Sequence, residues 1–483
     1  MTDLILIVGA GPVGSALALD LTRRGVPVHI VDRADGPFHG SRAKGVQPRT
    51  LEVLEDLGVL DALLAGASAY PRLGIHLGPL TIPRTMIAHQ PVTEDVPYPD
   101  TVLSPQFHTD RVLHDALRAA GVTVDYGRRV VGVEQHDDGV TTTFADGGTV
   151  HSAYVVGADG GSSTVRRQAG IGFTGDTDED DRMIIADVTI PGLRRNRWHV
   201  WPGRSGRFLG ACPLPDGELF QVMLRLPAAT PVSNDPDALQ ATVREALAAK
   251  KLTVGEFSWV SLFRPNIRLA EHYRAGRILL AGDAAHCHTP AGGQGLNTGV
   301  QDAYNLAWKL DEVLHGAPAS LLDTYEEERR PVAARVLKIS TDRYDSFEKD
   351  ARAATTRGDE ERQLKLTYRG SSLCPEGPDA ATAGVLRAGD RLPDARDAHG
   401  RRVFDLTAGP GFSVLAVGVD AETLERHRQD GWPAVHEVPA GTYGAQSPTL
   451  LLVRPDGYIG YIGTADSPAG IDDALRRMRR PTP

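Results

Sequence analysis

Residues 279–297 combine residue types that can bind a flat or anionic ligand. They read LLAGDAAHCHTPAGGQGLN: a short apolar run, an acidic turn at Asp283, a glycine-rich loop and the start of a helix predicted over about 296–310. Glycines let the backbone approach a ligand closely, and a helix N-terminus presents free N–H groups and the positive end of its dipole. Asp283, at the end of the apolar run, can accept hydrogen bonds from ligand hydroxyls. The stretch therefore predicts a small-molecule site.

Two histidines in this loop, His286 and His288, raise the question of a metal. No nearby cysteine or carboxylate pair completes a ligand set, so a metal has roughly one chance in twenty. The three cysteines, Cys212, Cys287 and Cys374, are far apart and form no CxxC. This spacing argues against a disulfide framework and is typical of a reducing cytosol. We predict no metal, and the pattern assigns no catalytic acid or base.

A second glycine loop lies near the N-terminus. An apolar run at 4–8 leads into Gly9-Ala10-Gly11-Pro12-Val13-Gly14, a helix is predicted over 15–24, and a strand over 28–32 ends at Asp32. A GxGxxG that follows a strand, opens a helix and has an acidic residue at the end of the next strand meets the conditions of the dinucleotide fingerprint. An ordinary glycine turn retains roughly one chance in ten. Asp32 is placed for a ribose.

Length and charge exclude several classes of protein. The chain has 483 residues, enough for two or three domains, and a formal charge of −10. An acidic chain is not expected to bind nucleic acid or an anionic membrane. The apolar start is too short for a signal peptide, and no apolar run approaches the ~20 residues of a membrane helix. We expect a soluble, cytoplasmic protein.

The periodicity of the chain predicts an α/β and α+β architecture with a Rossmann-like domain. Another buried strand meets a glycine loop and a helix over 154–166, whereas 171–275 read as antiparallel strands with one helix. Residues 355–383 read as a polar linker. The expected divisions are 1–75, 100–172 and 276–355 for the discontinuous dinucleotide-binding domain, 76–99 and 173–275 for the inserted substrate-binding domain, and 384–483 for a C-terminal α/β unit.

Taken together, the N-terminal fingerprint, the Gly157-Ala158-Asp159-Gly160 motif and the 282–297 stretch resemble the group A flavoprotein monooxygenases, of the para-hydroxybenzoate hydroxylase type. The resemblance covers roughly the first 350 residues. The C-terminal unit is similar to the thioredoxin-like tail of phenol hydroxylases and polyketide hydroxylases. Because this unit has no CxxC, it lacks dithiol chemistry, and we expect a structural or interface role.

The resemblance implies a tight, non-covalent FAD site. Its pyrophosphate and adenosine part would be held by Gly9, Gly11, Pro12, Val13, Gly14, Asp32 and Arg33. Its ribityl and ring part would be held by Arg42, Gly282, Asp283, Pro290, Gly293, Gly295, Leu296 and Asn297. Gln106 and Arg111 would contact FAD phosphate or ribityl groups, and the Asp159-Gly160 motif is associated in the family with both FAD and NAD(P)H.

Within this set the resemblance gives several residues a role. Asp283 would bind the ribityl chain, and the N–H groups of Leu296 and Asn297 would meet the flavin pyrimidine carbonyl. Arg42 and Pro290 would lie beside the flavin and are the candidates for a catalytic role.

The implied activity is that of an NAD(P)H-consuming monooxygenase. Through a C4a-hydroperoxyflavin it would insert one oxygen atom of O2 into an aromatic or polyketide-like small molecule, most simply by hydroxylation. The chain carries a single dinucleotide fingerprint, which is typical of transient docking of NADPH or NADH. Baeyer–Villiger oxidation, antibiotic inactivation and a non-oxygenating FAD oxidoreductase stay open as alternatives, as does the choice between monomer and homodimer.

Overall fold

The computed structural model describes residues 3–177, 181–203, 207–227, 230, 232–264, 266–288, 293–349, 358–374, 385–427, 431–466 and 468–479. A five-stranded sheet organises the first part of the chain, in the order β19-β20-β11-β1-β2. Four of its strands are parallel, and β19 runs antiparallel to β20. The strands are β1 (Ile5–Val8), β2 (Val28–Val31), β11 (Tyr154–Gly157), β19 (Arg274–Ala275) and β20 (Ile278–Leu280).

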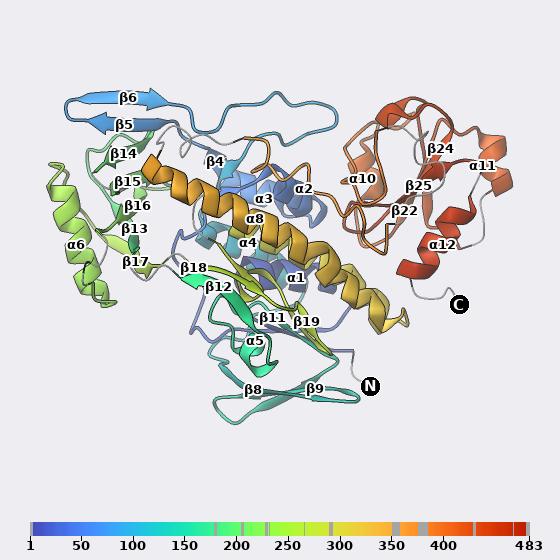
Figure 1. Ribbon diagram of the computed structural model, residues 1–483, viewed down its shortest axis with the longest axis horizontal. Helices are drawn as coiled ribbons and strands as arrows, with labels where there is room; N and C mark the ends of the chain where they lie inside the picture. The colour runs from blue at the N-terminus through green and yellow to red at the C-terminus, as the bar shows by residue number, and fades with distance from the viewer. Residues whose placement is uncertain are drawn as a thin grey trace.

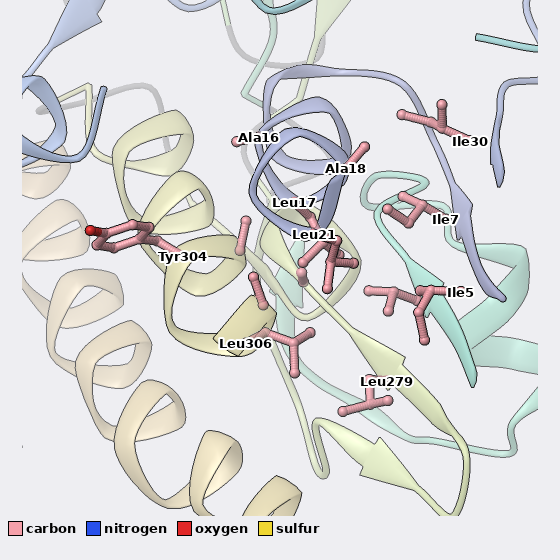
Figure 2. Close-up of a cluster of buried hydrophobic side chains, with 14 of the residues drawn as sticks. Ile5, Ile7, Ala16, Leu17, Ala18, Leu21, Ile30, Leu279, Tyr304 and Leu306 are labelled. Atoms are coloured by element: carbon pink, nitrogen blue, oxygen red, sulfur yellow. The ribbon is translucent and has the colours of Figure 1, made fainter. Parts of the chain in front are cut away.

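These parallel strands are almost continuously apolar because both faces of the sheet are covered. Figure 2 shows part of this core, where Ile5, Ile7 and Leu279 of the sheet lie near Leu17 and Leu21 of a helix. The α-helices of this part are α1 (Pro12–Arg23), α2 (Pro48–Asp56), α3 (Leu60–Ala65), α4 (Gln106–Ala119), α5 (Thr164–Gln168), α7 (Gly295–Leu314) and α8 (Asp323–Lys349). The predicted Rossmann-like layer is confirmed.

Helices α1 and α7 approach each other closely at their N-terminal ends. A Cβ added to Gly299 would lie 2.5 Å from a methyl carbon of Val13, and one added to Gly282 would lie 2.8 Å from the same carbon. Only glycine fits at such a separation. The two glycine-rich loops, about 270 residues apart in the sequence, therefore meet at one end of the sheet.

A seven-stranded sheet forms the second layer, in the order β17-β13-β16-β15-β14-β5-β6. It lies at one end of the molecule, with α6 (Pro236–Ala248) against it (Figure 1). All its neighbours are antiparallel except β14 and β5. Its strands are β5 (Leu73–Leu77), β6 (Leu80–Arg84), β13 (Met183–Thr189), β14 (Trp198–Pro202), β15 (Phe208–Pro213), β16 (Leu219–Arg225) and β17 (Phe257–Phe263).

The structure also contains three small sheets. They have the orders β10-β9-β8, β12-β18-β21 and β3-β7-β4. Their strands are β3 (Gly45–Val46), β4 (Ser68–Ala69), β7 (Val102–Leu103), β8 (Val130–His136), β9 (Gly139–Phe144), β10 (Thr149–Ser152), β12 (Phe173–Thr177), β18 (Asn266–Ala270) and β21 (His286–Cys287).

The C-terminal unit lies at the opposite end of the long axis from the seven-stranded sheet (Figure 1). Its mixed sheet has the order β23-β22-β24-β25, with β22 (Ser413–Val417), β23 (Ala434–Val438), β24 (Thr449–Val453) and β25 (Ile459–Thr464). Helices α10 (Val403–Thr407), α11 (Ala421–His427) and α12 (Ala469–Met478) accompany it. Its description as thioredoxin-like, and the domain limits given above, stay predictions.

Buried ion pairs attach this unit to the rest of the molecule. Arg454, before the β24–β25 turn, donates to both oxygens of Glu328 on α8, at 2.6 and 2.8 Å, and all of these side-chain atoms are buried. Glu328 also accepts from Lys309 of α7 at 2.7 Å, and Arg454 pairs with Asp456 at 2.6 Å. The opposite charges make the pKa of Glu328 lower than usual, although burial alone would raise it. The C-terminal unit is thus fastened to α8 and to α7, the helix that begins at the second glycine loop.

The expectation of a polar linker over 355–383 is wrong for residues 358–374. Leu366, Tyr368 and Leu373 are buried, and Leu366 and Tyr368 pack with Val332 and Val336 of α8. The hydroxyl of Tyr368 accepts from Arg329 at 3.0 Å. The composition of residues 358–374 predicted a linker because their apolar residues are too few to show a helix or strand period.

Candidate FAD and substrate site

One cavity of about 400 Å³ opens at the carboxyl ends of the parallel strands and extends to the seven-stranded sheet. Open parallel sheets bind ligands at this edge. We call it the main cavity. It is lined by Gly11, Pro12, Val13, Arg42, Ala43, Lys44, Gly45, Gln47, Tyr70, Met86, Ile87, Ala88, Gln90, Pro99, Thr101, Gln106, Ala158, Gly160, Ile185, Trp198, Gln221, Met223, Phe263, Asp283, His288, Gly293, Gln294, Gly295, Leu296, Gly358, Asp359, Glu361 and Arg362.

The three glycines of the N-terminal fingerprint differ in their surroundings. Gly9 has φ +108°, and a Cβ there would lie 2.3 Å from the carbonyl oxygen of Ala158. A Cβ on Gly14 would lie 1.9 Å from the carbonyl oxygen of Gly9, so this glycine allows the helix to pack on the strand. A Cβ on Gly11 would meet no neighbouring group within 4 Å, and the residue lines the main cavity. Gly11 thus leaves room for a ligand to reach the backbone at the start of α1.

Asp32 stabilises this turn through its carboxylate. One oxygen accepts from the backbone N–H of Ala10 at 2.8 Å, and the other accepts from Ala34 at 2.9 Å. Asp32 and the exposed Arg33 do not line the main cavity. Their contact with an adenosine ribose stays a prediction.

Of the two predicted residues on α4, the structure places one in the main cavity. Gln106 lines it and donates to Asp110 at 3.3 Å, whereas Arg111 is exposed and contacts His108 at 2.9 Å. Asp110 is buried, and one of its oxygens has no partner within the described residues. Burial raises the pKa of Asp110 to about 8, with the negative charge of Asp32 acting in the same direction.

The loop after β11 joins the two glycine-rich regions. Asp159 accepts from the backbone N–H groups of Thr164 at 2.6 Å and Val165 at 3.2 Å, at the start of α5. Arg166 donates to the carbonyl oxygen of Ala284 at 2.7 Å, which fixes the turn that carries Asp283. Gly160 lines the main cavity.

The 282–297 stretch contributes Asp283, Gly293, Gly295 and Leu296 to the main cavity. Gly282 lies against α1, and Pro290 falls outside the described residues.

The side chain of Asn297 is used within the protein. It donates to the carbonyl oxygens of Gly45 and Gly293, at 2.8 Å each, and accepts from the backbone N–H of Gln47 at 2.8 Å. It therefore connects the N-terminus of α7 to the loop that carries Arg42.

Two lining groups that sequence reasoning missed lie where this loop meets the seven-stranded sheet. The ammonium of the buried Lys44 donates to Gln221, lies 3.7 Å from the sulfur of Met223 and lies 4.4 Å from the ring centre of Trp198. Burial lowers the pKa of Lys44 below its usual range. No local pattern marks Lys44, because a loop lysine is usually a solvated surface charge, and for Gln221 the strand pattern held no signal.

The rest of this wall is apolar and aromatic. Ile185, Trp198, Met223 and Phe263 come from four different strands of the seven-stranded sheet. Such a wall suits a flat apolar ligand.

The described residues of the main cavity offer the kinds of groups that FAD needs. Gly11 leaves the backbone of a helix N-terminus open to the pyrophosphate, Asp283 offers a carboxylate, and the N-terminus of α7 faces the same cavity. Within the described parts of the chain, no group of three metal-binding side chains comes together, and no helix is long and apolar enough to cross a membrane.

Comparison with known proteins agrees with this geometry. The FAD binding domain family matches residues 1–340. A protein named flavin-dependent monooxygenase from Mycobacteroides abscessus is 41% identical over 472 residues, which are 94% of this chain and 96% of that protein. The rifampicin monooxygenase of Rhodococcus hoagii is 36% identical over 499 residues and 98% of both chains. Aklavinone-11 hydroxylase, solved as a ternary complex with FAD and aklavinone, has a TM-score of 0.81 at 26% identity over 98% of both chains.

The fold and the site define an FAD-binding protein. The chain belongs to the FAD binding domain family, as a flavoprotein monooxygenase with FAD as its cofactor.

Proposed function

We propose that the enzyme consumes NAD(P)H and O2 and inserts one oxygen atom into an aromatic or polyketide-like small molecule, with hydroxylation as the reaction. The observation that carries the proposal is the continuity of the main cavity. It extends from Gly11 and Asp283 to Trp198 and Phe263. A cofactor and an aromatic substrate can thus share one enclosed space. Relatives named for rifampicin and aklavinone support this class of substrate.

Bound FAD supplies the redox and oxygen chemistry. The protein binds the cofactor and the substrate, orients the substrate and excludes water from the cavity. Trp198 and Phe263 present aromatic surfaces to the substrate, while Lys44 and Gln221 offer polar groups that can orient a ring hydroxyl or carbonyl. The ammonium of Lys44 donates to the side-chain oxygen of Gln221, and the carboxylate of Asp187 favours its charged form, so an electron-rich oxygen of a ligand there would be favoured.

Labelled oxygen tests the proposal directly. Phenolic and polyketide compounds are screened for stimulated NADPH and NADH oxidation, and an accepted compound is then turned over under 18O2. We expect one labelled oxygen in the product, attached to a ring carbon. A label placed within a new ester would identify Baeyer–Villiger chemistry. Oxidation with no label in any product would identify a non-oxygenating oxidoreductase and overturn the proposal.

A pair of variants on β14 tests the position of the substrate. Trp198→Ala removes a ring that lines the main cavity, and Trp201→Ala removes one that stacks on His76 and does not line it. We expect KM for the accepted compound to rise at least tenfold in Trp198→Ala, with its FAD content unchanged, and to stay within twofold in Trp201→Ala. Equal effects of the two variants would place the substrate elsewhere.

A further inference from the structure

Three side chains form a continuous hydrogen-bonded row from the main cavity into the core. His288 lines the cavity, and its Nε2 lies 2.8 Å from Nδ1 of His286. Nε2 of His286 lies 2.5 Å from Oδ2 of Asp302 on α7. His286 and Asp302 are fully buried. The row lies beside two cavity-lining residues, because a Cβ on Gly295 would lie 3.6 Å from the ring of His288 and 3.7 Å from the carboxylate of Asp283.

The hydrogen bonds at the inner end fix the direction of the row. Asp302 accepts from Nε of Arg329 at 2.7 Å and from the backbone N–H of Gly282 at 3.2 Å. Burial works against ionisation of Asp302, but His286 and Arg329 outweigh it and lower its pKa. The ionised carboxylate can only accept, so Nε2 of His286 is the donor. In neutral His286, Nδ1 must then accept from Nε2–H of His288.

This assignment leaves Nδ1 of His288 with a free lone pair. The atom is buried and has no partner within the described residues. A histidine that only braced the loop would be expected to use both of its nitrogens. The row therefore ends, within a residue that lines the cavity, in a buried group that can accept a proton.

We propose that His288, His286 and Asp302 are a proton relay. A proton that reaches Nδ1 of His288 is matched by transfer of the Nε2 proton of His288 to Nδ1 of His286. The charge then rests on His286 as an imidazolium ion against the carboxylate of Asp302. His288 is the conduit, and His286 and Asp302 are positioning residues that store the charge.

The titratable groups that surround the row keep their protonation states, so only the two histidines exchange the proton. Burial lowers the pKa of His288 well below its usual range, and a positive charge on His286 acts in the same direction once the proton has reached it, so the ring of His288 transmits the proton without holding it. Burial raises the pKa values of Tyr273 and Tyr325, which face the row, so both stay neutral. The other charged or titratable groups nearby are Asp283 and Cys287 beside the loop, and Arg329 and its partner Tyr368 behind Asp302.

The role of the relay rests on the proposed function, whereas its hydrogen bonds do not. Hydride transfer from NAD(P)H brings two electrons and one proton, so it adds one negative charge to the cavity. Uptake of one further proton from solvent by the relay balances that charge beside the site. Reduction of the FAD-loaded enzyme should thus bind two protons for each two electrons, one of them on His286.

The pH dependence of the reduction potential tests the relay without substrate or oxygen. For a two-electron couple, a tenfold change in equilibrium corresponds to about 30 mV, so each additional proton steepens the slope by about 30 mV per pH unit. The FAD-loaded protein is reduced with dithionite at several values between pH 6 and 9. We expect the slope of His288→Gln to be shallower than that of the wild type by about 30 mV per pH unit. Glutamine keeps a donor toward His286 but cannot pass a proton.

His315→Gln is the matched control, because His315 forms an exposed pair with Asp311 at 2.9 Å at the other end of α7. Its slope should equal that of the wild type. Nitrogen NMR of histidine-labelled wild type gives a second readout that does not depend on a variant folding, since His286 should become an imidazolium on reduction. Equal slopes in wild type and His288→Gln, or a His286 signal unchanged on reduction, would overturn the relay. Dithionite bypasses NAD(P)H and substrate, so failure of 18O incorporation would leave this result intact.

Discussion

Gly11 and Gly14 stand three residues apart in one turn, yet a methyl group on each would meet opposite surroundings. Around Gly11 there is open space that belongs to the main cavity, whereas at Gly14 the methyl carbon would lie 1.9 Å from a carbonyl oxygen. Both glycines were predicted as cofactor ligands. The structure indicates that one leaves room for the ligand and the other for the fold.

Substituting the two glycines separates these roles. Gly11→Ala should fold with a thermal midpoint, measured without FAD, close to that of the wild type, and should bind FAD at least tenfold more weakly. Gly14→Ala forces backbone apart and should lower the unfolding free energy by about 3 kcal/mol. Differential scanning fluorimetry and FAD titration measure both quantities. A Gly11→Ala protein that keeps full FAD affinity would exclude close contact of the ligand at this turn.

At the scale of single residues, the sequence predicted groups whose neighbours are local and missed those whose neighbours are distant. Gly11, Gly160 and Asp283 belong to short motifs that fix their own geometry, and all three line the main cavity. Lys44 and Gln221 are 177 positions apart, and nothing in either local pattern indicates that they meet. The relay of His286 needs Asp302 from one helix and Arg329 from another, which no spacing rule supplies.

At the scale of elements, the loop between β2 and α2 is held from both sides. Ser41 donates its backbone N–H to Asp187 of β13 at 2.6 Å and its hydroxyl to the same carboxylate at 2.5 Å. Asn297 of α7 binds Gly45 and Gln47 at the other end of the loop. Arg42 and Lys44 lie between these anchors, so the loop presents them to the main cavity in a defined position.

The anchor at Asp187 should make stability depend on pH. Burial raises its pKa to about 6, although the hydrogen bonds from Ser41 and the charge of Lys44 act in the opposite direction. The folded state thus keeps a proton that the unfolded chain releases near pH 4, so the unfolding free energy falls as the pH rises from about 4 to about 6. We expect the difference between wild type and Asp187→Asn to change by about 2 kcal/mol over this range in urea unfolding. A constant difference would show that Asp187 titrates normally.

The elements themselves were largely predictable, and their pairing was not. The run before Gly9 and the turn at Asp456-Gly457 mark a buried strand and a hairpin, and the structure contains both. The pairing of β5 with β14 joins residues more than 120 positions apart through only three pairs of residues. Residues 358–374 show no period because their few apolar side chains pack on different distant partners: Leu366 and Tyr368 on α8 and Tyr458, and Leu373 in the core of the C-terminal unit.

At the scale of the whole molecule, the C-terminal unit supports the cofactor-binding part. Arg454 joins Glu328 and Asp456 in a region fully excluded from water, with Lys309 and Trp308 of α7 beside it. Further contacts reach α2, where Arg391 pairs with Glu52 at 3.0 Å. A unit with so many buried charges at its interface is not expected to separate reversibly.

Removing one buried charge should show how much the stability of the protein depends on the contact between the C-terminal unit and the cofactor-binding part. Arg454→Met leaves Glu328 and Asp456 buried without their main partner and should lower the unfolding free energy by about 3–5 kcal/mol. The matched control is Arg476→Met, which removes an exposed partner of Asp473 and should change stability by less than about 0.5 kcal/mol. Denaturant unfolding followed by both flavin and tryptophan fluorescence measures whether the two parts unfold together. An unfolding free energy of Arg454→Met equal to that of the wild type would contradict the role assigned to the Arg454–Glu328 pair.

Residues 358–362 have a consequence for the order of events during synthesis. Gly358, Asp359, Glu361 and Arg362 line the main cavity, and the chain that follows is held by the C-terminal unit through hydrogen bonds of Leu364 and Thr367. The N-terminal glycine turn is therefore made first, but the cavity gains its last wall only after more than two thirds of the chain has been translated. At 5–20 residues per second, roughly 6–25 s separate that wall from the end of the C-terminal unit. Nascent chains in this interval would release the cofactor readily, and lasting retention would mark completion of the C-terminal unit.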